Sequence, residues 1–218
     1  MMTESSLPCV VVGAGPVGLT AALALASHGL EVVVVEGEPE GRQRPGSRAI
    51  FLANPTLRRL EQAAPGAGRG VASAGLQVRG YDTYYAGKRV FRMPFPVAKD
   101  PLHGLGSSVP QTVLEKLALA RLAEIGVPIR WGNPIIDVHT NSDCVTLDFE
   151  SGPPMHAAYV IAADGARSVV RRSLGITMEG PSDETPFVIV DVDELPDGST
   201  SRSYGYFHYQ CADLGGAT

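Results

Sequence analysis

The hydrophobic positions near the start of the chain fall into three consecutive segments. Pro8–Val12 is a short apolar run of β-branched residues, which is typical of a strand. Pro16–His28 has the composition of a helix, and Gly29 can adopt the left-handed conformation that ends one. Leu30–Val35 is apolar without alternation, as expected for a parallel strand that helices cover on both faces. The pattern therefore predicts a strand-helix-strand unit over residues 8–36.

Later segments alternate between helical and strand-like patterns. They predict, in chain order, a helix from Asn54-Pro55 to about Ala64 with Asn54 as its cap, a loop over Ala63–Gly75, an antiparallel hairpin from Gln77 to Arg92 that turns at Ala86-Gly87, a helix over Pro110–Ile125, strands over Val145–Phe149 and Ala158–Ala163, a short helix from about Arg167 to Leu174, and strands over Phe187–Val192 and Ser203–Tyr209. This order predicts an α/β fold. Residues 1–180 are expected to form a Rossmann-like domain with a parallel sheet and an inserted hairpin at about 77–92. Residues 181–218 are expected to be the incomplete start of a β-rich domain.

The turn between the first strand and the helix reads G-A-G-P-V-G over residues 13–18. In this dinucleotide-binding fingerprint the first glycine permits a tight turn, the second lets the backbone approach a pyrophosphate, and the third lets the helix pack on the strand. The free N–H groups at the start of the helix then meet the phosphate charge. The predicted cofactor-binding residues of this turn are Gly13, Gly15, Pro16, Val17 and Gly18. An ordinary glycine-rich loop is the alternative, and the flanking strand and helix disfavour it.

Glu36 closes the unit at the end of the second strand. A carboxylate at this position can accept a hydrogen bond from a ribose 2′-OH, and it would repel a 2′-phosphate, which disfavours NADP here. A solvated charge at a strand end is the alternative interpretation. Because FAD and NAD both carry an ADP group, this unit alone does not distinguish between them.

Composition excludes several other classes of protein. The formal net charge of −5 gives no broad cationic surface for DNA or RNA. The three cysteines are widely spaced, so neither a disulfide framework nor a zinc site is indicated, and a reducing cytoplasm fits best. From Cys9 to Leu30 no Asp, Glu, Lys or Arg occurs, but four glycines and a proline interrupt this stretch and no basic residue precedes it. We therefore expect neither a membrane span nor a signal segment.

Motifs farther along the chain favour FAD. The fingerprint is followed by Ser47-Arg48-Ala49, by Gln111 and by Ala163-Asp164-Gly165-Ala166-Arg167-Ser168. With these motifs the chain resembles the group A FAD-dependent aromatic monooxygenases, the p-hydroxybenzoate hydroxylase-like family, up to about residue 180. The resemblance implies an FAD-binding domain followed by a substrate domain. It also implies that Arg48 and Gln111 lie near the FAD pyrophosphate, and that Asp164 helps to hold FAD and the incoming NAD(P)H.

Each of these three residues also has a plainer interpretation. Arg48 and the other arginines between residues 42 and 69 could be solvated surface residues. Asp164 follows a buried-looking strand, at the edge where open α/β sheets bind ligands, and could simply cap a helix. Gln111 could be exposed. Ile135 aligns weakly with a family position near adenine, and we leave it out of the predicted site.

The resemblance also implies a reaction. NAD(P)H would reduce the flavin, and one atom of O2 would be transferred to a small aromatic substrate, with the cofactor supplying the chemistry. The sequence identifies no catalytic side chain and no metal site. Tyrosines in the strand-rich segments are candidates for substrate contact, although half-buried sheet tyrosines explain them equally well: Tyr81, Tyr84, Tyr85, Tyr204, Tyr206 and Tyr209.

The chain departs from the family in one respect. The family's later G-D-A-A-H motif, which binds the ribityl chain and closes over the flavin ring, is absent from these 218 residues. We therefore expect this chain to be the amino-terminal portion of a monooxygenase and inactive alone. Two alternatives stay open: another FAD enzyme, such as a reductase, oxidase or halogenase, and a truncated, non-catalytic nucleotide-binding module.

Overall fold

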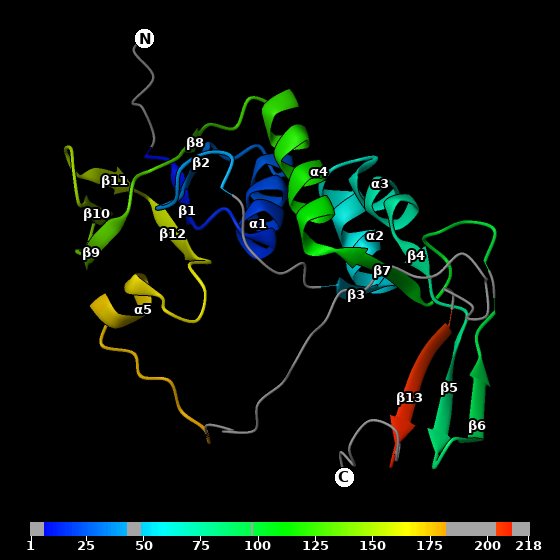
Figure 1. Ribbon diagram of the computed structural model, residues 1–218. Coiled ribbons are helices and arrows are strands. Elements are labelled where there is room, and N and C mark those ends of the chain that lie inside the picture. Colours follow the sequence, from blue (N-terminus) through cyan, green and yellow to red (C-terminus); the bar gives the residue numbers. More distant parts are fainter. Residues whose placement is uncertain (1–6, 43–48, 97, 182–203, 211–218) are drawn as a thin grey trace.

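A computed structural model of the chain describes residues 7–42, 49–96, 98–181 and 204–210. The described residues contain five helices, which Figure 1 labels. The helices are α1 (Pro16–Ser27), α2 (Asn54–Ala63), α3 (Ala67–Ala74), α4 (Gln111–Glu124) and α5 (Val169–Ser173).

The central sheet is parallel and has the strand order β12-β1-β2-β8. Its strands are β1 (Cys9–Val12), β2 (Val32–Val35), β8 (Ile129–Arg130) and β12 (Tyr159–Ala162). Strand β1 lies in the middle, with Val10 paired to Val33 on one side and to Val160 on the other. The predicted strand-helix-strand unit is thus confirmed as β1-α1-β2, and the α/β fold with a parallel sheet is confirmed with it.

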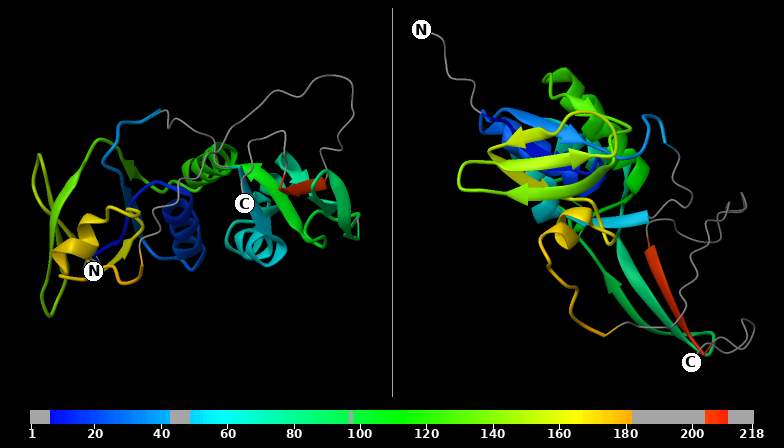
Figure 2. Two further views of the ribbon diagram at one scale, coloured as in Figure 1. Left: turned by 60° about the horizontal axis from the view of Figure 1, so that its bottom comes forward. Right: turned by 90° about the vertical axis from the view of Figure 1, so that its left-hand side faces the viewer.

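The two faces of the parallel sheet pack against different layers. Val11 and Val34 share a buried cluster with residues of α1 and α4, whereas Val10 and Val35 pack with residues of a second sheet. That second sheet is antiparallel and contains β9 (Ile135–Thr140), β10 (Val145–Phe149) and β11 (Met155–Ala157). Figure 2 shows it lying across the parallel sheet. Our expectation of helices alone on both faces is therefore wrong, because β9–β11 cover one face together with the short α5, which contributes Val170.

Helices α2 and α3 and a small third sheet extend the core beyond α1. This sheet has the order β3-β7-β4, with β3 (Ala49–Ala53), β4 (Leu76–Gln77) and β7 (Gly106–Pro110). The loop predicted over residues 63–75 is wrong, because Gly66 makes a left-handed turn and α3 follows it. The glycine content reflects close packing: a Cβ on Gly68 would lie 2.2 Å from the carbonyl oxygen of Leu57. Asn54 is also not a cap; it is the first helical residue and its amide donates to the carbonyl of Gly104.

A fourth sheet projects from the rest of the molecule. The predicted hairpin is confirmed as β5 (Gly80–Tyr85) and β6 (Lys88–Pro94), which turn through Ala86 and Gly87, both at positive φ. Strand β13 (Tyr204–Tyr209) pairs in parallel with β5, so segments far apart in sequence form one sheet (Figures 1 and 2). The strand predicted over Phe187–Val192 lies outside the described residues, and the division of the chain at residue 180 stays a prediction.

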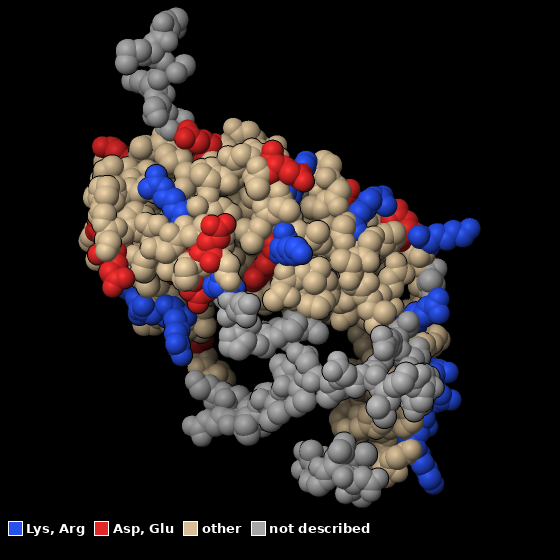
Figure 3. Space-filling model, turned by 45° about the horizontal axis from the view of Figure 1, so that its top comes forward, with Lys and Arg blue, Asp and Glu red and all other residues tan. Residues whose placement is uncertain are grey.

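The charges on the surface of the described residues are mixed, in agreement with the small net charge of the chain. Acidic and basic side chains are interspersed over most of the face in Figure 3. Within the residues that the structure describes, no helix is both long and apolar enough to cross a membrane. Helix α1, which the uncharged stretch after Cys9 had made a candidate, has only twelve residues.

Candidate functional site

The turn from β1 into α1 is held by close backbone packing. Gly13 has a φ of +103°, and a Cβ there would lie 2.4 Å from the carbonyl oxygen of Ala163. A Cβ on Gly18 would lie 1.9 Å from the carbonyl oxygen of Gly13. Side chains are therefore excluded at both positions, as the fingerprint requires. The turn is closed by a 2.8 Å hydrogen bond from Gly13 N–H to the carbonyl of Val35.

Gly15 differs from the other two glycines. Its φ is −80° and its ψ is 178°, an extended conformation that any residue can adopt. Positive φ is therefore not the reason for a glycine at this position. A Cβ on Gly15 would meet no atom within 4 Å, so the space in front of the backbone is open. Pro16 and Val17 follow in the first turn of α1, and Val17 is 69% exposed.

Glu36 is buried, with only 7% of its surface exposed, and is not a solvated strand end. Its Oε2 accepts a 2.7 Å hydrogen bond from the N–H of Ala14, and its Oε1 accepts a 3.0 Å hydrogen bond from the N–H of Glu38. The backbone of Glu36 is tied to Arg130 and Asn133 by two further hydrogen bonds of 2.9 Å. The carboxylate is thus attached to the glycine-rich turn.

A cavity of about 270 Å³ opens at the carboxyl ends of the parallel strands. Its lining combines the glycine-rich turn with residues 35–37, 133–135 and 163–169: Val12, Gly13, Gly15, Val35, Glu36, Gly37, Asn133, Pro134, Ile135, Ala163, Asp164, Gly165 and Val169. Gly13, Gly15, Glu36 and Asp164, predicted separately from the sequence, all line this one cavity. Such an edge is where open α/β sheets bind ligands.

Asp164 lies where β12 ends, at the border of the cavity. Its Oδ2 accepts hydrogen bonds from Val169 N–H at 2.7 Å and from Val170 N–H at 3.2 Å, and so satisfies two free N–H groups in the first turn of α5. The N-cap of α5 itself is Ser168, whose hydroxyl accepts a hydrogen bond from Arg171 N–H at 3.0 Å, so Asp164 supports the start of the helix without being its N-cap. The other oxygen of Asp164, Oδ1, is the one that a ligand could use. The preceding strand is not buried as expected: β12 is an edge strand, and Tyr159 is 72% exposed.

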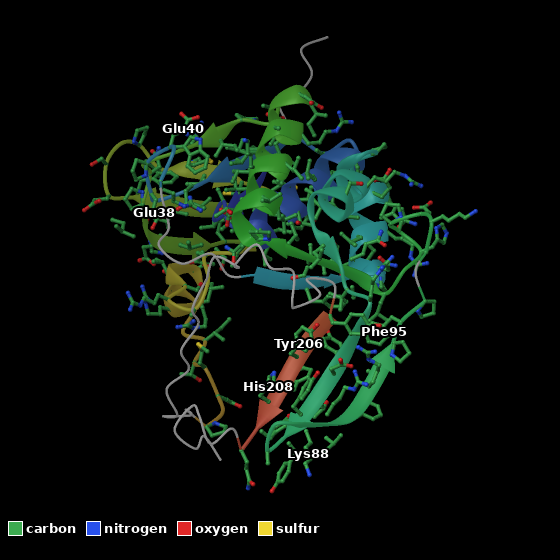
Figure 4. All side chains as sticks on the ribbon, turned by 45° about the vertical axis from the view of Figure 1, so that its right-hand side comes forward. Glu38, Glu40, Lys88, Phe95, Tyr206 and His208 are labelled. Carbon is green, nitrogen blue, oxygen red and sulfur yellow. The ribbon has the colours of Figure 1, made fainter. Side chains whose placement is uncertain are left out.

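Four of the predicted residues that the structure describes do not line this cavity: Pro16, Val17, Gly18 and Gln111. Gln111 begins α4 and donates a 2.8 Å hydrogen bond to Glu115, which lines a neighbouring hollow. Arg48 lies outside the described residues. The six candidate tyrosines all lie on β5 and β13, away from the cavity. Among them, the ring of Tyr84 stacks on His208 at 4.7 Å, and Figure 4 shows Tyr206 and His208 on β13.

Three residues of this region were missed or dismissed in the sequence. Ile135 and Asn133 line the cavity, and the order of the strands brings them there: β9 begins beside the end of β2. Arg42, expected at the surface, has a side chain that is 10% exposed and ion-paired to Glu36 at 3.0 Å. The sequence indicates this position of Arg42 only through the preceding glycine, Gly41. In the structure Gly41 has a φ of +75°, which permits a turn just before Arg42.

No group of three or more His, Cys, Asp or Glu in the described part of the chain could hold a metal ion. The chemistry of the cavity instead suits a nucleotide. It offers exposed backbone at Gly15, a carboxylate at Glu36, and apolar walls at Val12, Val35 and Ile135.

Comparison with known proteins agrees with this arrangement. Residues 6–212 match the family model described as FAD binding domain. The chain is 31% identical over 175 residues to a rifampicin monooxygenase from Streptomyces venezuelae, covering 78% of this chain and 34% of that protein. It is 30% identical over 177 residues to a para-nitrophenol 4-monooxygenase from Pseudomonas sp. strain WBC-3, covering 78% and 43%.

Solved structures give the same result. A p-nitrophenol 4-monooxygenase from Pseudomonas putida DLL-E4 superposes with a TM-score of 0.71 at 27% identity, covering 81% of this chain and 45% of that one. The flavin-dependent monooxygenase PieE, solved with FAD and substrate, superposes with a TM-score of 0.67 at 27% identity, covering 82% and 33%. The chain spans about a third of the length of the first curated relatives that it matches.

Proposed function

This chain belongs to the FAD binding domain family, and on that premise we propose that its cavity holds the adenosine and pyrophosphate of FAD within an aromatic monooxygenase. One observation carries the proposal. The buried carboxylate of Glu36 and the open backbone of Gly15 line the same cavity, next to the N-terminus of α1. These are the groups that an ADP moiety needs, an acceptor for a ribose hydroxyl and N–H groups for a pyrophosphate.

The residues present fit that moiety. Because a Cβ on Gly15 would project into open space, the missing side chain leaves room for phosphate oxygens against the backbone. Glu36 lines the cavity, and its Oε1 accepts a hydrogen bond from Glu38 N–H, which leaves this oxygen able to accept a second one from a ribose hydroxyl. Adenine, which is flat and largely apolar at its faces, suits the wall formed by Val35 and Ile135.

The chain's own residues would bind and orient the cofactor. Glu36 would accept a ribose O–H, the first N–H groups of α1 would donate to the pyrophosphate, and Asp164 Oδ1 would accept a hydrogen bond at the border of the cavity. When bound, FAD supplies the redox chemistry, taking electrons from NAD(P)H and delivering one oxygen atom of O2 to the substrate. Arg48 and Gln111 remain proposed pyrophosphate contacts.

A small aromatic substrate is proposed from the names of the relatives, which include enzymes for para-nitrophenol and for 3-(3-hydroxyphenyl)propionate. Tyrosines and His208 on the β13-β5-β6 sheet offer stacking surfaces for such a ring. Use of NAD(P)H follows from the same family. The widely spaced cysteines support a reducing compartment, for which we propose the cytoplasm.

Two measurements test the proposal. Titration of the chain with FAD, followed by flavin fluorescence, should saturate at one site and be competed by ADP; absence of saturable binding would contradict FAD binding. NAD(P)H oxidation by the longest polypeptide that contains this chain should be stimulated by phenols, with hydroxylated product seen by mass spectrometry. Oxidation that phenols do not stimulate would instead indicate a flavin reductase or oxidase.

A further inference from the structure

The guanidinium of Arg42 contacts the Glu36 carboxylate and two further groups next to it. Its Nη1 lies 3.0 Å from Glu36 Oε2, its Nε lies 2.7 Å from Glu38 Oε2, and its Nη2 donates a 3.2 Å hydrogen bond to the carbonyl of Ala14. Figure 4 shows Glu38 on the segment after β2, far from the hairpin. The guanidinium therefore joins this segment to the glycine-rich turn.

These contacts limit how Glu36 can bind a ligand. A carboxylate offers about four lone-pair positions. Oε2 accepts a hydrogen bond from Ala14 N–H and has the guanidinium of Arg42 beside it at 3.0 Å, whereas Oε1 accepts a hydrogen bond from Glu38 N–H alone. Among the described residues Oε1 therefore keeps an acceptor position that no neighbour crowds, and Glu36 lines the cavity. A ribose with two hydroxyls can therefore give Glu36 one hydrogen bond, and the orientation of the carboxylate decides which hydroxyl makes it.

Arg42 itself does not line the cavity of Glu36. It lines the neighbouring hollow with Ala14 and Trp131, and its guanidinium lies 5.6 Å from the centre of the Trp131 ring. Its Nη1 is buried without a hydrogen-bond partner among the described residues, so its contact with Glu36 is ionic. A group in this place can act on a ligand only through Glu36 or the turn.

The fold holds Arg42 in this place from both sides. The N–H of Arg42 donates to the carbonyl of Pro39 at 3.3 Å in the turn that Gly41 permits. On the other side, Trp131 is tied to the cavity wall, because Asn133 donates a 2.7 Å hydrogen bond to its carbonyl. Since Trp131 is the single tryptophan of the chain, its fluorescence reports on the surroundings of Arg42.

We infer that Arg42 is a positioning residue, which fixes the Glu36 carboxylate against the turn and thereby sets the preference of the site for a 2′-hydroxylated ribose. The inference rests on the proposed function, since it requires the cavity to bind adenosine. Arg42 performs this role through its ion pair with the buried carboxylate of Glu36. A buried carboxylate without a partner is costly, so removal of Arg42 should disturb the position of Glu36. The Nη1, Nε and Nη2 of Arg42 each contact a different group, whereas a lysine would have to reach all three groups from a single nitrogen.

The test compares ADP with 2′-deoxy-ADP by titration calorimetry on the 218-residue chain. The wild type should prefer ADP by about 10-fold or more, the effect of one charge-assisted hydrogen bond. In Arg42→Ala the preference should fall toward unity and ADP affinity should drop by about 10-fold. Arg42→Lys should recover part of the preference, and ADP should shift the Trp131 emission in the wild type more than in Arg42→Ala.

Arg121→Ala is the matched control. Arg121 is also ion-paired, to Glu124 at 2.7 Å, but lines a hollow with Gly29 and Val32 at the opposite ends of the strands. The Arg121→Ala variant should bind ADP and 2′-deoxy-ADP with the affinities of the wild type. A folded Arg42→Ala variant that keeps both the ADP affinity and the 2′-OH preference of the wild type would overturn the inference. A wild type that binds neither ADP nor FAD would overturn the proposed function, and the inference with it.

A double variant covers the case in which Arg42→Ala does not fold. Glu36→Gln removes the buried charge, and adding Arg42→Met then leaves no unpaired carboxylate at Glu36. If Arg42 acts through Glu36, the double variant should show the same small 2′-OH preference as Glu36→Gln alone. A further loss of preference in the double variant would show that Arg42 contacts the nucleotide independently, against the inference.

Discussion

The carboxylate of Glu36 and the N–H of Ala14, 22 residues apart in sequence, are joined by a buried hydrogen bond of 2.7 Å. This bond attaches the end of β2 to the turn that begins α1. The proposed acceptor for the ribose and the proposed donors for the pyrophosphate are therefore directly connected, and a change in one is expected to disturb the other.

Replacing Glu36 by alanine should weaken both FAD binding and the fold. Loss of a charge-assisted hydrogen bond to ribose predicts an affinity lower by about 10- to 100-fold. The unpaired Ala14 N–H should also lower the free energy of unfolding by about 1–3 kcal/mol. Calorimetric titration and urea unfolding measure the two effects. Glu31→Ala, an exposed acid just before the other end of β2, is the control, and FAD affinity equal in both variants would remove Glu36 from the site.

The glycines at positions 15 and 18 should respond in opposite ways. Gly15→Val projects a side chain into open space from extended backbone, so the chain should fold as before and lose nearly all FAD binding. Gly18→Ala places a Cβ 1.9 Å from a backbone oxygen of Gly13, so it should destabilise the fold by at least about 3 kcal/mol. Thermal unfolding and flavin titration distinguish them. A Gly15→Val chain that still takes up stoichiometric FAD would contradict the assignment of the turn.

The sheet that carries the tyrosines should be sensitive to acid. Asp82 is 1% exposed and accepts two hydrogen bonds from Arg92, at 2.8 and 2.9 Å, and Arg92 lies over the ring of Tyr204. The hydrogen bonds from Arg92 hold the pKa of Asp82 below its usual value. Because the pKa of Asp82 is lower in the folded chain than in the unfolded chain, its ionised carboxylate stabilises the fold above the unfolded pKa of about 3.9. This stabilisation is lost as the pH falls through the pKa of the folded chain.

Near-ultraviolet circular dichroism can follow this loss, because six of the seven tyrosines lie on β5 and β13. We expect the aromatic signal to be constant from neutral pH to about pH 4 and to decline below it. Asp82→Asn cannot ionise, so it should weaken the signal at neutral pH and remove this acid transition. An unchanged transition in Asp82→Asn would assign it to other carboxyls.

The 218-residue chain alone should bind the ADP portion of FAD weakly and should not hydroxylate phenols. The described cavity of about 270 Å³ suits adenosine and pyrophosphate, and it lies apart from the sheet that carries the tyrosines. The motif that closes over the flavin ring in the family is absent from these 218 residues, so we expect water to reach the ring, and exclusion of water protects the reactive species in such reactions. Incubation with FAD, NAD(P)H and phenols, followed by mass spectrometry, tests this; coupled product formation by the chain would contradict it.

The sequence predicted the parts of the fold that depend on local pattern. The β1-α1-β2 unit, α4 and the β5-β6 hairpin follow from apolar periodicity and from turns such as Ala86-Gly87. Helix α3 was missed because its glycines are selected by contacts with α2 rather than by helix propensity. Of the β9–β11 layer only β10 was predicted, over Val145–Phe149, and its role as the cover of one sheet face was missed because that role depends on tertiary packing.

The candidate site was predictable where a motif fixes both residue type and place. Gly13, Gly15 and Glu36 are of this kind. Arg42 is not, because its burial depends on the turn at Gly41 and on Trp131, which arrives from a distant strand connection. Ile135 is of the same kind: an apolar strand residue gives no signal for a ligand until the strands are assembled.

The most direct test of the central claim is an amide chemical-shift titration of the isotopically labelled chain with ADP. Our account predicts shifts concentrated at Gly13, Gly15, Glu36 and Gly165, which line one cavity, with little change at α2 or on β6. The same titration on Glu36→Gln should need about 10-fold more ADP. Shifts that bypass the glycine-rich turn and Glu36, or that are the same in Glu36→Gln, would contradict the assignment of this cavity as the adenosine site.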